Sequence, residues 1–297
     1  VSNTGDIIWE KPISQPVLGK INKIDVYKNG KTQLLFNTAD SLFCLDRKGN
    51  DVAGFPVALP SKTSNPLALF DYDFNQNFRI LIGTNDGNMY MYGQKGSRVK
   101  GWKFKKVRSA ITGMAKHLKL GKKDYILVTT GNGTVLLLDR KGKSRYRVSE
   151  NIGDKSGPVF YYTARNIQHS GIFYIDTLGR VVKLKFGGKK EYLPINGEQK
   201  DRLKVKLIPG ENKFGFFVYN SKKISFYYSD GKKIFDPIEM KNIEFQPNFY
   251  RFDSKNWIGI VDNTDQQAYL IDFTGIIKDG FPLTSSIPFS IGDINGD

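Results

Sequence analysis

The sequence predicts an all-β chain, and three observations carry this prediction. A turn glycine returns seven times, at intervals of 43 to 47 residues. Each glycine is followed, four or six residues later, by an aromatic residue. Short apolar runs separated by Asn, Asp and Gly fill the intervals, which is typical of a β-propeller with one four-stranded blade per repeat. The glycines are Gly5, Gly49, Gly96, Gly142, Gly188, Gly231 and Gly275, and the aromatic residues are Trp9, Phe55, Trp102, Tyr146, Tyr192, Phe235 and Phe281.

The second full repeat shows the pattern most clearly. Its first three strands are predicted over residues 66–70, 78–82 and 89–92, and its fourth strand contains residues 102–104. A polar turn at residues 71–77 joins the first two strands. Strands of about five residues bounded by Asn, Asp and Gly clusters follow the usual pattern of antiparallel sheets.

The central strands of the other repeats are apolar on both faces, which suits sheets stacked between neighbouring sheets. The fourth strands carry more charge, which suits outer edges that must not pair with other chains. No stretch has convincing helical periodicity. The second strands are predicted at 32–36, 125–128, 172–175, 214–218 and 257–261, and the third strands at 42–45, 135–138, 181–184, 224–228 and 268–271.

Six repeats are complete and a seventh is split between the two ends of the chain. Its last turn and strand are predicted at residues 5–9, and its first strand at residues 287–291. The middle of that blade is missing from the sequence. We therefore expect residues 1–297 to form one propeller domain with six complete blades and an incomplete seventh, as a piece of a longer protein.

Composition limits the remaining possibilities. No apolar stretch reaches 18 residues, so no membrane-spanning segment is expected in this chain. Cys44 is the only cysteine and lies in an apolar predicted strand, which favours a buried, inert thiol over a nucleophile. A single cysteine also excludes an internal disulfide.

Positive charge is unevenly distributed along the chain. The formal net charge is +16, and residues 98–147 hold fifteen Lys and Arg against Asp124 and Asp139. Residues 229–297 hold eleven acidic side chains against six basic ones. Basic residues could protect outer strands from edge pairing. They could also form an anion-binding face for phospholipid head groups, acidic polysaccharide, nucleic acid or an acidic protein. The predicted anion-binding and partner-binding residues are Lys100, Lys103, Lys105, Lys106, Arg108, Arg145 and Arg147.

Aromatic residues interleave with this basic stretch, as they do in proteins that bind single-stranded nucleic acid. Trp102 and Tyr146, however, occupy the regular aromatic position of the repeat, which Phe55 and Phe281 occupy outside the basic stretch. This equivalence favours packing, and the sequence argues against nucleic acid as the partner.

Two turns have the alternating oxygen ligands with which calcium loops begin. Asp71, Asp73 and Asn75 form one set, and Asp293, Asn295 and Asp297 form the other. A complete loop also needs a later carboxylate, which the first set lacks nearby. A hairpin capped by Asp side chains is the commoner outcome of such a pattern. The sequence predicts no cofactor, and it leaves calcium at either turn as an open alternative.

No catalytic residue is assigned. His117 and His169 are the only histidines, they lie in different repeats, and neither belongs to a pair with metal-ligand spacing. Carboxylates from distant repeats could still converge at the centre of a propeller, as in propeller glycosidases.

The repeat resembles bacterial propellers of the quinoprotein-like and WD40-like superfamily. The resemblance rests on residues 45–50 leading to 54–56, residues 138–142, and residues 271–275 leading to 280–283. Residues 293–297 also resemble the first turn of the FG-GAP repeats of integrin-type propellers. The resemblance implies four-stranded blades, an extracytoplasmic location and a role as an interaction platform. Three scattered Trp and one Cys do not supply the Trp-rich motif and vicinal disulfide of quinoprotein dehydrogenases, so their redox role is not carried over.

The sequence therefore favours a non-catalytic scaffold or binding module of a bacterial envelope or secreted protein, periplasmic, outer-membrane-associated or secreted. Its partner would be a protein or an anionic polymer. The alternative is a propeller enzyme with a central site, either carbohydrate-active or a degenerate quinone-dependent dehydrogenase.

Overall fold

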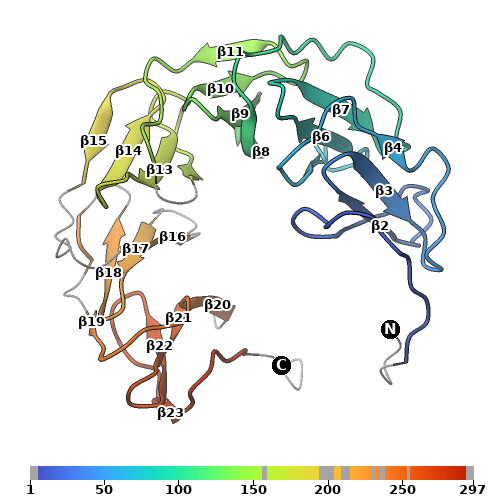
Figure 1. The fold of residues 1–297 in the computed structure, drawn as a ribbon. Helices are drawn as coiled ribbons and strands as arrows, with labels where there is room; N and C mark the ends of the chain where they lie inside the picture. The colour runs from blue at the N-terminus through green and yellow to red at the C-terminus, as the bar shows by residue number, and fades with distance from the viewer. Residues whose placement is uncertain are drawn as a thin grey trace. The chain divides into compact units, whose positions relative to one another are not determined.

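The structure of the protein is a computed structural model. The structure describes residues 6–155, 159–193, 204–208, 215–228, 232–234, 238–252 and 255–291. Every regular element within these residues is a β-strand, and the strands form six antiparallel sheets (Figure 1). Each sheet consists of strands that follow one another in the chain, so the all-β propeller class predicted from the repeat is confirmed.

The chain divides into two compact units. Unit 1 comprises Val1–Gly153, Thr163–Ser170 and Phe186–Lys189. It contains the first three sheets, one for each of the first three repeats. The first sheet is β1 (Asn22–Ile24), β2 (Gln33–Asn37), β3 (Ser41–Leu45) and β4 (Val57–Ala58). The second is β5 (Ala68–Phe70), β6 (Arg79–Gly83) and β7 (Met89–Gly93). The third is β8 (Ile111–Leu120), β9 (Lys123–Thr130), β10 (Val135–Leu138) and β11 (Ser144–Arg147).

Unit 2 comprises Asp154–Tyr162, Gly171–Lys185 and Lys190–Asp297. It contains the other three sheets, each with four strands. The fourth sheet is β12 (Phe160–Tyr162), β13 (Gly171–Ile175), β14 (Val181–Lys185) and β15 (Lys190–Tyr192). The fifth is β16 (Lys204–Ile208), β17 (Gly215–Tyr219), β18 (Lys223–Tyr228) and β19 (Ile238–Glu239). The sixth is β20 (Asn248–Phe252), β21 (Lys255–Asp262), β22 (Gln267–Asp272) and β23 (Leu283–Thr284).

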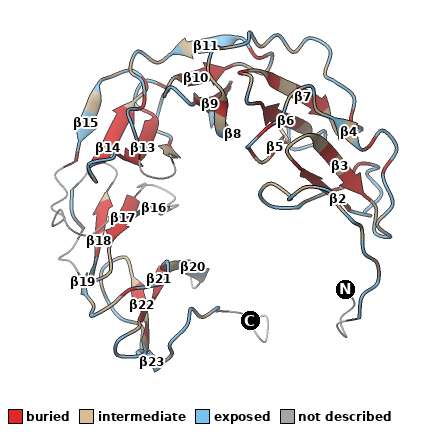
Figure 2. Ribbon diagram, viewed as in Figure 1, coloured by how far each residue is buried: buried red, intermediate tan, exposed pale blue. Residues whose placement is uncertain are grey.

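Within each unit the hydrophobic core lies between consecutive sheets, which explains why the central strands are apolar on both faces. Phe216 and Phe217 are neighbours in β17 and both are fully buried. Because side chains alternate across a strand, Phe216 packs with Phe173 of the fourth sheet, while Phe217 packs in a cluster with Ile258 of the sixth. Figure 2 shows the same distribution, with buried residues concentrated in central strands such as β13, β14 and β17 and exposed residues in outer strands such as β15.

Two of the recurring glycines, Gly49 and Gly142, contact the recurring aromatic residue that precedes them in the chain. Gly142 has a φ of +80°, a left-handed conformation that favours glycine. A Cβ atom at this position would lie 3.0 Å from the ring of Trp102, the aromatic residue of the preceding repeat. Gly49 repeats this arrangement with Trp9, whose Nε1 donates a hydrogen bond to the carbonyl of Arg47 at 2.9 Å. The sequence signal that predicted the repeat is thus a packing contact.

The second repeat differs from the prediction, because residues 102–104 do not form a fourth strand. The sheet of β5, β6 and β7 ends at β7. Trp102 Nε1 donates a hydrogen bond to the main-chain carbonyl of Met89 at 2.8 Å. The indole therefore uses a main-chain acceptor of β7. Lys103 N donates instead to the carbonyl of Lys141 in the next repeat, at 2.7 Å. The segment after Trp102 therefore leaves its own sheet.

The split seventh blade remains a prediction. Residues 6–9 and 287–291 contain no strand in the structure, and Gly5 and residues 292–297 lie outside the described residues.

Candidate anion-binding site

The basic stretch 98–147 runs from the end of β7 to the end of β11 and lies entirely in unit 1. The structure places a cavity of about 520 Å³ within it, which we call the Phe104 cavity. One wall comes from the segment that leaves the second sheet, and the other comes from β10 and the hairpin between β10 and β11. The lining residues are Lys103, Phe104, Lys105, Val107, Leu136, Leu138, Gly142, Lys143 and Ser144.

The cavity occurs where the second repeat lacks its fourth strand. In the first repeat the residue equivalent to Phe104 is Val57, two positions after the recurring aromatic residue. Val57 belongs to β4 and pairs with Leu42 of β3. A Cβ atom on Gly96 would lie 3.0 Å from its side chain, so Val57 packs against the turn of the next repeat. The segment around Phe104 has no such pairing with its own sheet, and the space beside β10 stays open.

Three lysines contribute the charge of the cavity. Lys103, Lys105 and Lys143 line it and are exposed to solvent. Within the described residues, none of these three ammonium groups has a carboxylate within ion-pair distance. Lys106, by contrast, pairs with Asp86 at 3.3 Å. The lysines of the cavity therefore present uncompensated positive charge.

Strand pairing places the two predicted arginines of β11 on different faces. Arg147 pairs with Leu136, a cavity residue, and directly paired residues project to the same face of a sheet. Arg145 falls in the β-bulge of the β10–β11 pairing, and its guanidinium lies over the ring of Tyr125, 5.7 Å from the centroid. Lys100 and Arg108 are exposed but do not line the cavity.

The structure therefore brings Lys103 and Lys105 together at the cavity, with Arg147 on the same face of the sheet. Lys143 belongs to this group but was absent from the residues predicted from sequence. The sequence did contain a signal for Lys143. It follows the turn glycine Gly142, and the same position holds the uncharged residues Asn50 in the first repeat and Ser97 in the second, so a lysine there departs from these two repeats.

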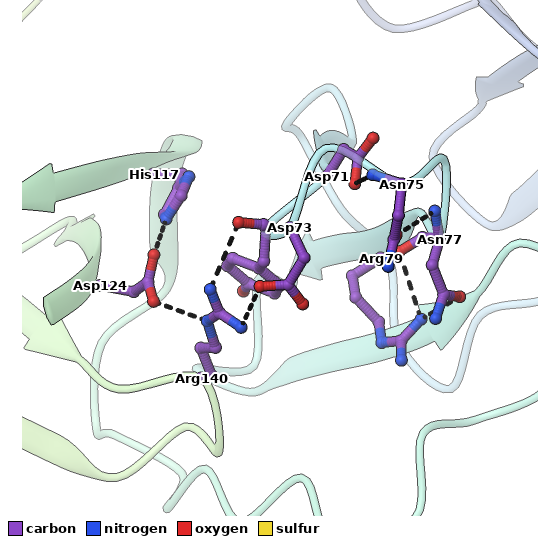
Figure 3. A network of polar contacts seen from close by, with 9 residues as sticks. Asp71, Asp73, Asn75, Asn77, Arg79, His117, Asp124 and Arg140 are labelled. Atoms are coloured by element: carbon purple, nitrogen blue, oxygen red, sulfur yellow. Dashed lines mark hydrogen bonds and ion pairs between the residues drawn. The ribbon is translucent and has the colours of Figure 1, made fainter. Parts of the chain in front are cut away.

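A second polar cluster in unit 1 joins the second and third repeats (Figure 3). Arg140 Nε donates to Asp124 Oδ2 at 2.6 Å, and Arg140 Nη1 donates to Asp73 Oδ1 at 2.8 Å. His117 Nε2 lies 2.6 Å from the other oxygen of Asp124. The guanidinium also stacks over Tyr72, 4.6 Å from its ring centroid.

Asp124 is the most buried carboxylate of this cluster, with 10% of its side chain exposed. Burial raises the pKa of its carboxyl, but hydrogen bonds and charge from His117 and Arg140 outweigh burial and hold the pKa below its usual value. The carboxylate of Asp124 therefore joins β8 and β9 to Arg140 in the hairpin after β10, and Arg140 in turn reaches Asp73 in the turn after β5. With no nucleophile beside it, the cluster is best explained as an inter-sheet clasp.

The predicted calcium turn at Asp71 is closed by its own hydrogen bonds. Asp71 Oδ1 accepts from the main-chain N–H of Asn75 at 3.1 Å, and Asn75 Oδ1 accepts from Asn77 N at 3.0 Å (Figure 3). Asp71 Oδ2 accepts from the main-chain N–H of Gln76 at 2.8 Å. Asp73 is engaged by Arg140. This geometry matches an Asp-capped hairpin.

The first repeat contains the same turn without the second carboxylate. Asp25 accepts from the N–H groups of Asn29 and Gly30, and Asn29 Oδ1 accepts from Lys31 N. Tyr27 occupies the position equivalent to Asp73. The turn thus forms with or without a complete set of oxygen ligands, and calcium at Asp71, Asp73 and Asn75 stays a prediction. Asp293, Asn295 and Asp297 lie outside the described residues.

The described part of the chain contains no group of three or more His, Cys, Asp or Glu side chains that could hold a metal ion. His169 is exposed, and its Nδ1 lies 2.7 Å from Asn166 Oδ1. No helix among the described residues is long and apolar enough to cross a membrane.

No family model and no curated protein matches the chain by sequence. Solved structures do match its fold. The chain is similar to BBS1N, crystallised in complex with ARL6DN, with 12% identity, a TM-score of 0.54, and coverage of 91% of this chain and 84% of that chain. It is also similar to the WD40 domain of SCAP from fission yeast, with 11% identity, a TM-score of 0.53, and coverage of 90% and 68%.

A third similar structure is the dihydro-heme d1 dehydrogenase NirN, with 14% identity and a TM-score of 0.55. The match covers 92% of this chain but only 57% of NirN. These neighbours have propeller-type folds, and the similarity supports a propeller fold for this chain. Because identities are this low and the neighbours include both binding domains and an enzyme, the similarity shows the fold alone.

Proposed function

We propose that this chain is a non-catalytic binding module that contacts an acidic surface of a protein partner through the basic stretch 98–147. The observation that carries the proposal is the group of uncompensated lysines at the Phe104 cavity, with Arg147 on the same face of the sheet. Clustered charge of one sign, free of internal counter-ions, accelerates and orients association with a surface of opposite charge.

The lining of the cavity argues against the enzymatic alternative at this site. Its residues include no Asp, Glu, His or Cys, so they supply no carboxylate pair for glycoside chemistry and no general base other than lysine. BBS1N, a similar structure, is bound to a protein in its crystal. This analogy rests on similarity of fold, so it supports a binding role in general and not a particular partner. The cell-envelope location stays a prediction of the resemblance described above.

Two variants with the same change in net charge test the proposal. The first replaces Lys103, Lys105 and Arg147 with Glu, and the second replaces Lys31, Lys48 and Lys62, which are exposed lysines of unit 1 outside the basic stretch. Binding to poly-L-glutamate, a model of an acidic protein segment, is measured by fluorescence anisotropy over a range of salt concentrations.

We expect the first variant to lose about tenfold or more in affinity and to show a flatter salt dependence, because three close charges are reversed. The second variant should retain most of its affinity. Equal losses in the two variants would mean that only the net charge matters, and the proposed contact surface would be wrong.

A further inference from the structure

We propose that the Phe104 cavity binds a free amphipathic carboxylate, a molecule with one carboxylate head group and an unbranched aliphatic body. This inference goes beyond the proposed function, because it assigns a small-molecule ligand and not a macromolecular partner. It rests on the volume, lining and charge of the cavity and on a comparison with the place where Trp9 packs on Gly49.

The size and walls of the cavity fit an apolar body. Its volume of about 520 Å³ falls within the range of small-molecule sites. Phe104, Val107, Leu136 and Leu138 supply the apolar walls, and Leu138 is itself buried in the core between the second and third sheets. Ser144 is the only uncharged polar side chain of the lining. A sugar or nucleotide would leave most of its polar groups without partners there, at a large cost in desolvation.

The charged residues of the lining select the head group. All three are lysines, and an ammonium group donates hydrogen bonds but accepts none. A carboxylate can therefore be held at the mouth of the cavity while its chain occupies the apolar part. A cationic head group would meet repulsion from all three side chains, so the site discriminates by charge sign.

The place where Trp9, which precedes the first sheet, packs on Gly49 does not have this combination. Trp9 packs on Gly49 as Trp102 packs on Gly142, so the two places can be compared residue by residue. The positions equivalent to Phe104 and Ser144 hold Lys11 and Asp51 there, and these form an ion pair at 2.7 Å.

Two of the three cavity lysines, Lys103 and Lys143, also have acidic or uncharged counterparts at that place. Glu10 stands at the position equivalent to Lys103, and Asn50 at the position equivalent to Lys143. The apolar lining bordered by unpaired lysines is thus not repeated where Trp9 packs on Gly49.

Titration of the whole chain with dodecanoate, below its micellar concentration, tests the proposal by calorimetry. We expect saturable one-to-one binding that tightens from octanoate to decanoate to dodecanoate, by up to about fourfold for each added methylene. Dodecyltrimethylammonium, which has the same chain and the opposite charge, should bind at least about tenfold more weakly. Equal binding of the two head groups, or uptake of several equivalents without saturation, would overturn the proposal.

Variants separate the head-group contacts from the chain contacts. Lys103→Gln with Lys143→Gln should weaken dodecanoate binding about fivefold to tenfold and leave dodecanol binding unchanged, because only the charge contact is removed. Lys31→Gln with Lys48→Gln is the matched control and should bind dodecanoate as the parent does.

Val107→Trp should fill the cavity and abolish binding of both ligands. Leu136→Phe, a smaller filling change, serves if the first variant does not retain the thermal stability of the parent. Dodecanoate binding that is unaffected by filling the cavity would refute the site.

Binding to vesicles of phosphatidylglycerol is measured as the last experiment. Saturable binding to vesicles without binding of free dodecanoate would contradict a site for the free carboxylate.

Discussion

The Oδ1 atom of Asn65 accepts a hydrogen bond from the main-chain N–H of Gly113, at a distance of 2.5 Å. Asn65 precedes the second sheet, whereas Gly113 lies at the irregular part of β8, where the pairing with β9 shifts register. The Nδ2 atom of the same amide donates to the carbonyls of Ile111 and Gly83 at 2.8 and 3.3 Å. One buried side chain therefore satisfies main-chain groups of two neighbouring sheets.

Replacing Asn65 with Ala should reduce the free energy of unfolding by about 1–3 kcal/mol, because the N–H of Gly113 and the carbonyls of Ile111 and Gly83 each lose a hydrogen bond. Urea denaturation monitored by tryptophan fluorescence measures the change. Asn85→Ala is the control, since Asn85 is exposed and its side chain makes one hydrogen bond, with Ser64. That control should change stability by less than about 0.5 kcal/mol. Similar losses in the two variants would contradict a bridging role for Asn65.

The Asp124 clasp predicts a specific pH dependence. The folded pKa of Asp124 lies below its unfolded value of about 3.9, so its contribution to stability is present above that pH and is lost as the pH falls through the folded pKa. Asp124→Asn should be less stable than the parent by about 1–3 kcal/mol at pH 7, because hydrogen bonds to a charged group are lost. The difference should shrink as the pH is lowered below about 4. Urea midpoints at pH 7, 4 and 3 provide the measurement, and a difference that does not change with pH would contradict the clasp.

The Asp71 turn should be self-sufficient without a cation. Asp71→Ala removes the acceptor of two main-chain N–H groups and should cost about 0.5–2 kcal/mol, as the loss of a capping side chain does. Asp25→Ala removes the same two bonds from the equivalent turn and should cost a similar amount. For the parent and for each variant, the melting temperature measured in EDTA should equal the melting temperature measured in calcium. A melting temperature that rises with calcium in the parent, and not in Asp71→Ala, would instead establish a calcium site.

Cys44 should be unreactive in the folded protein. Its side chain is fully buried, and burial raises the pKa of the thiol to about 12. Because the thiolate is the reactive form, alkylation by iodoacetamide at pH 8 should be negligible until urea unfolds the chain. Mass spectrometry of the intact protein measures the modification. Rapid labelling without denaturant would show that the strand around Cys44 opens readily.

The sequence predicted the fold because its signals are local and act within one repeat or between neighbours. A left-handed turn glycine and a pair of apolar strands recur at a nearly fixed spacing, and at Gly49 and Gly142 an aromatic residue from the preceding part of the chain covers the glycine. The buried state of Cys44 followed from the same reasoning. The prediction of a fourth strand in the second repeat was wrong, because nothing in the sequence indicates that the Trp102 indole donates a hydrogen bond to a main-chain carbonyl of β7.

The candidate site could be predicted only in part. Charge density pointed to residues 98–147, but the cavity depends on where the segment after Trp102 goes when it leaves its sheet. Arg140 and Asp73 are 67 residues apart and belong to different repeats, so their pairing has no signature in the sequence. Lys143 was missed because density alone does not show which side chains share a face.

The contacts of Gly49 with Trp9 and of Gly142 with Trp102 give unit 1 a direction. Trp9 shields the hairpin of the first sheet and Trp102 that of the third, so in both cases the covering residue belongs to the preceding part of the chain. Loss of an earlier repeat would uncover its successor, whereas loss of a later one would leave the hairpin before it covered. Fraying should therefore spread more readily toward the C-terminal side, and stability should behave as a chain of asymmetric nearest-neighbour couplings.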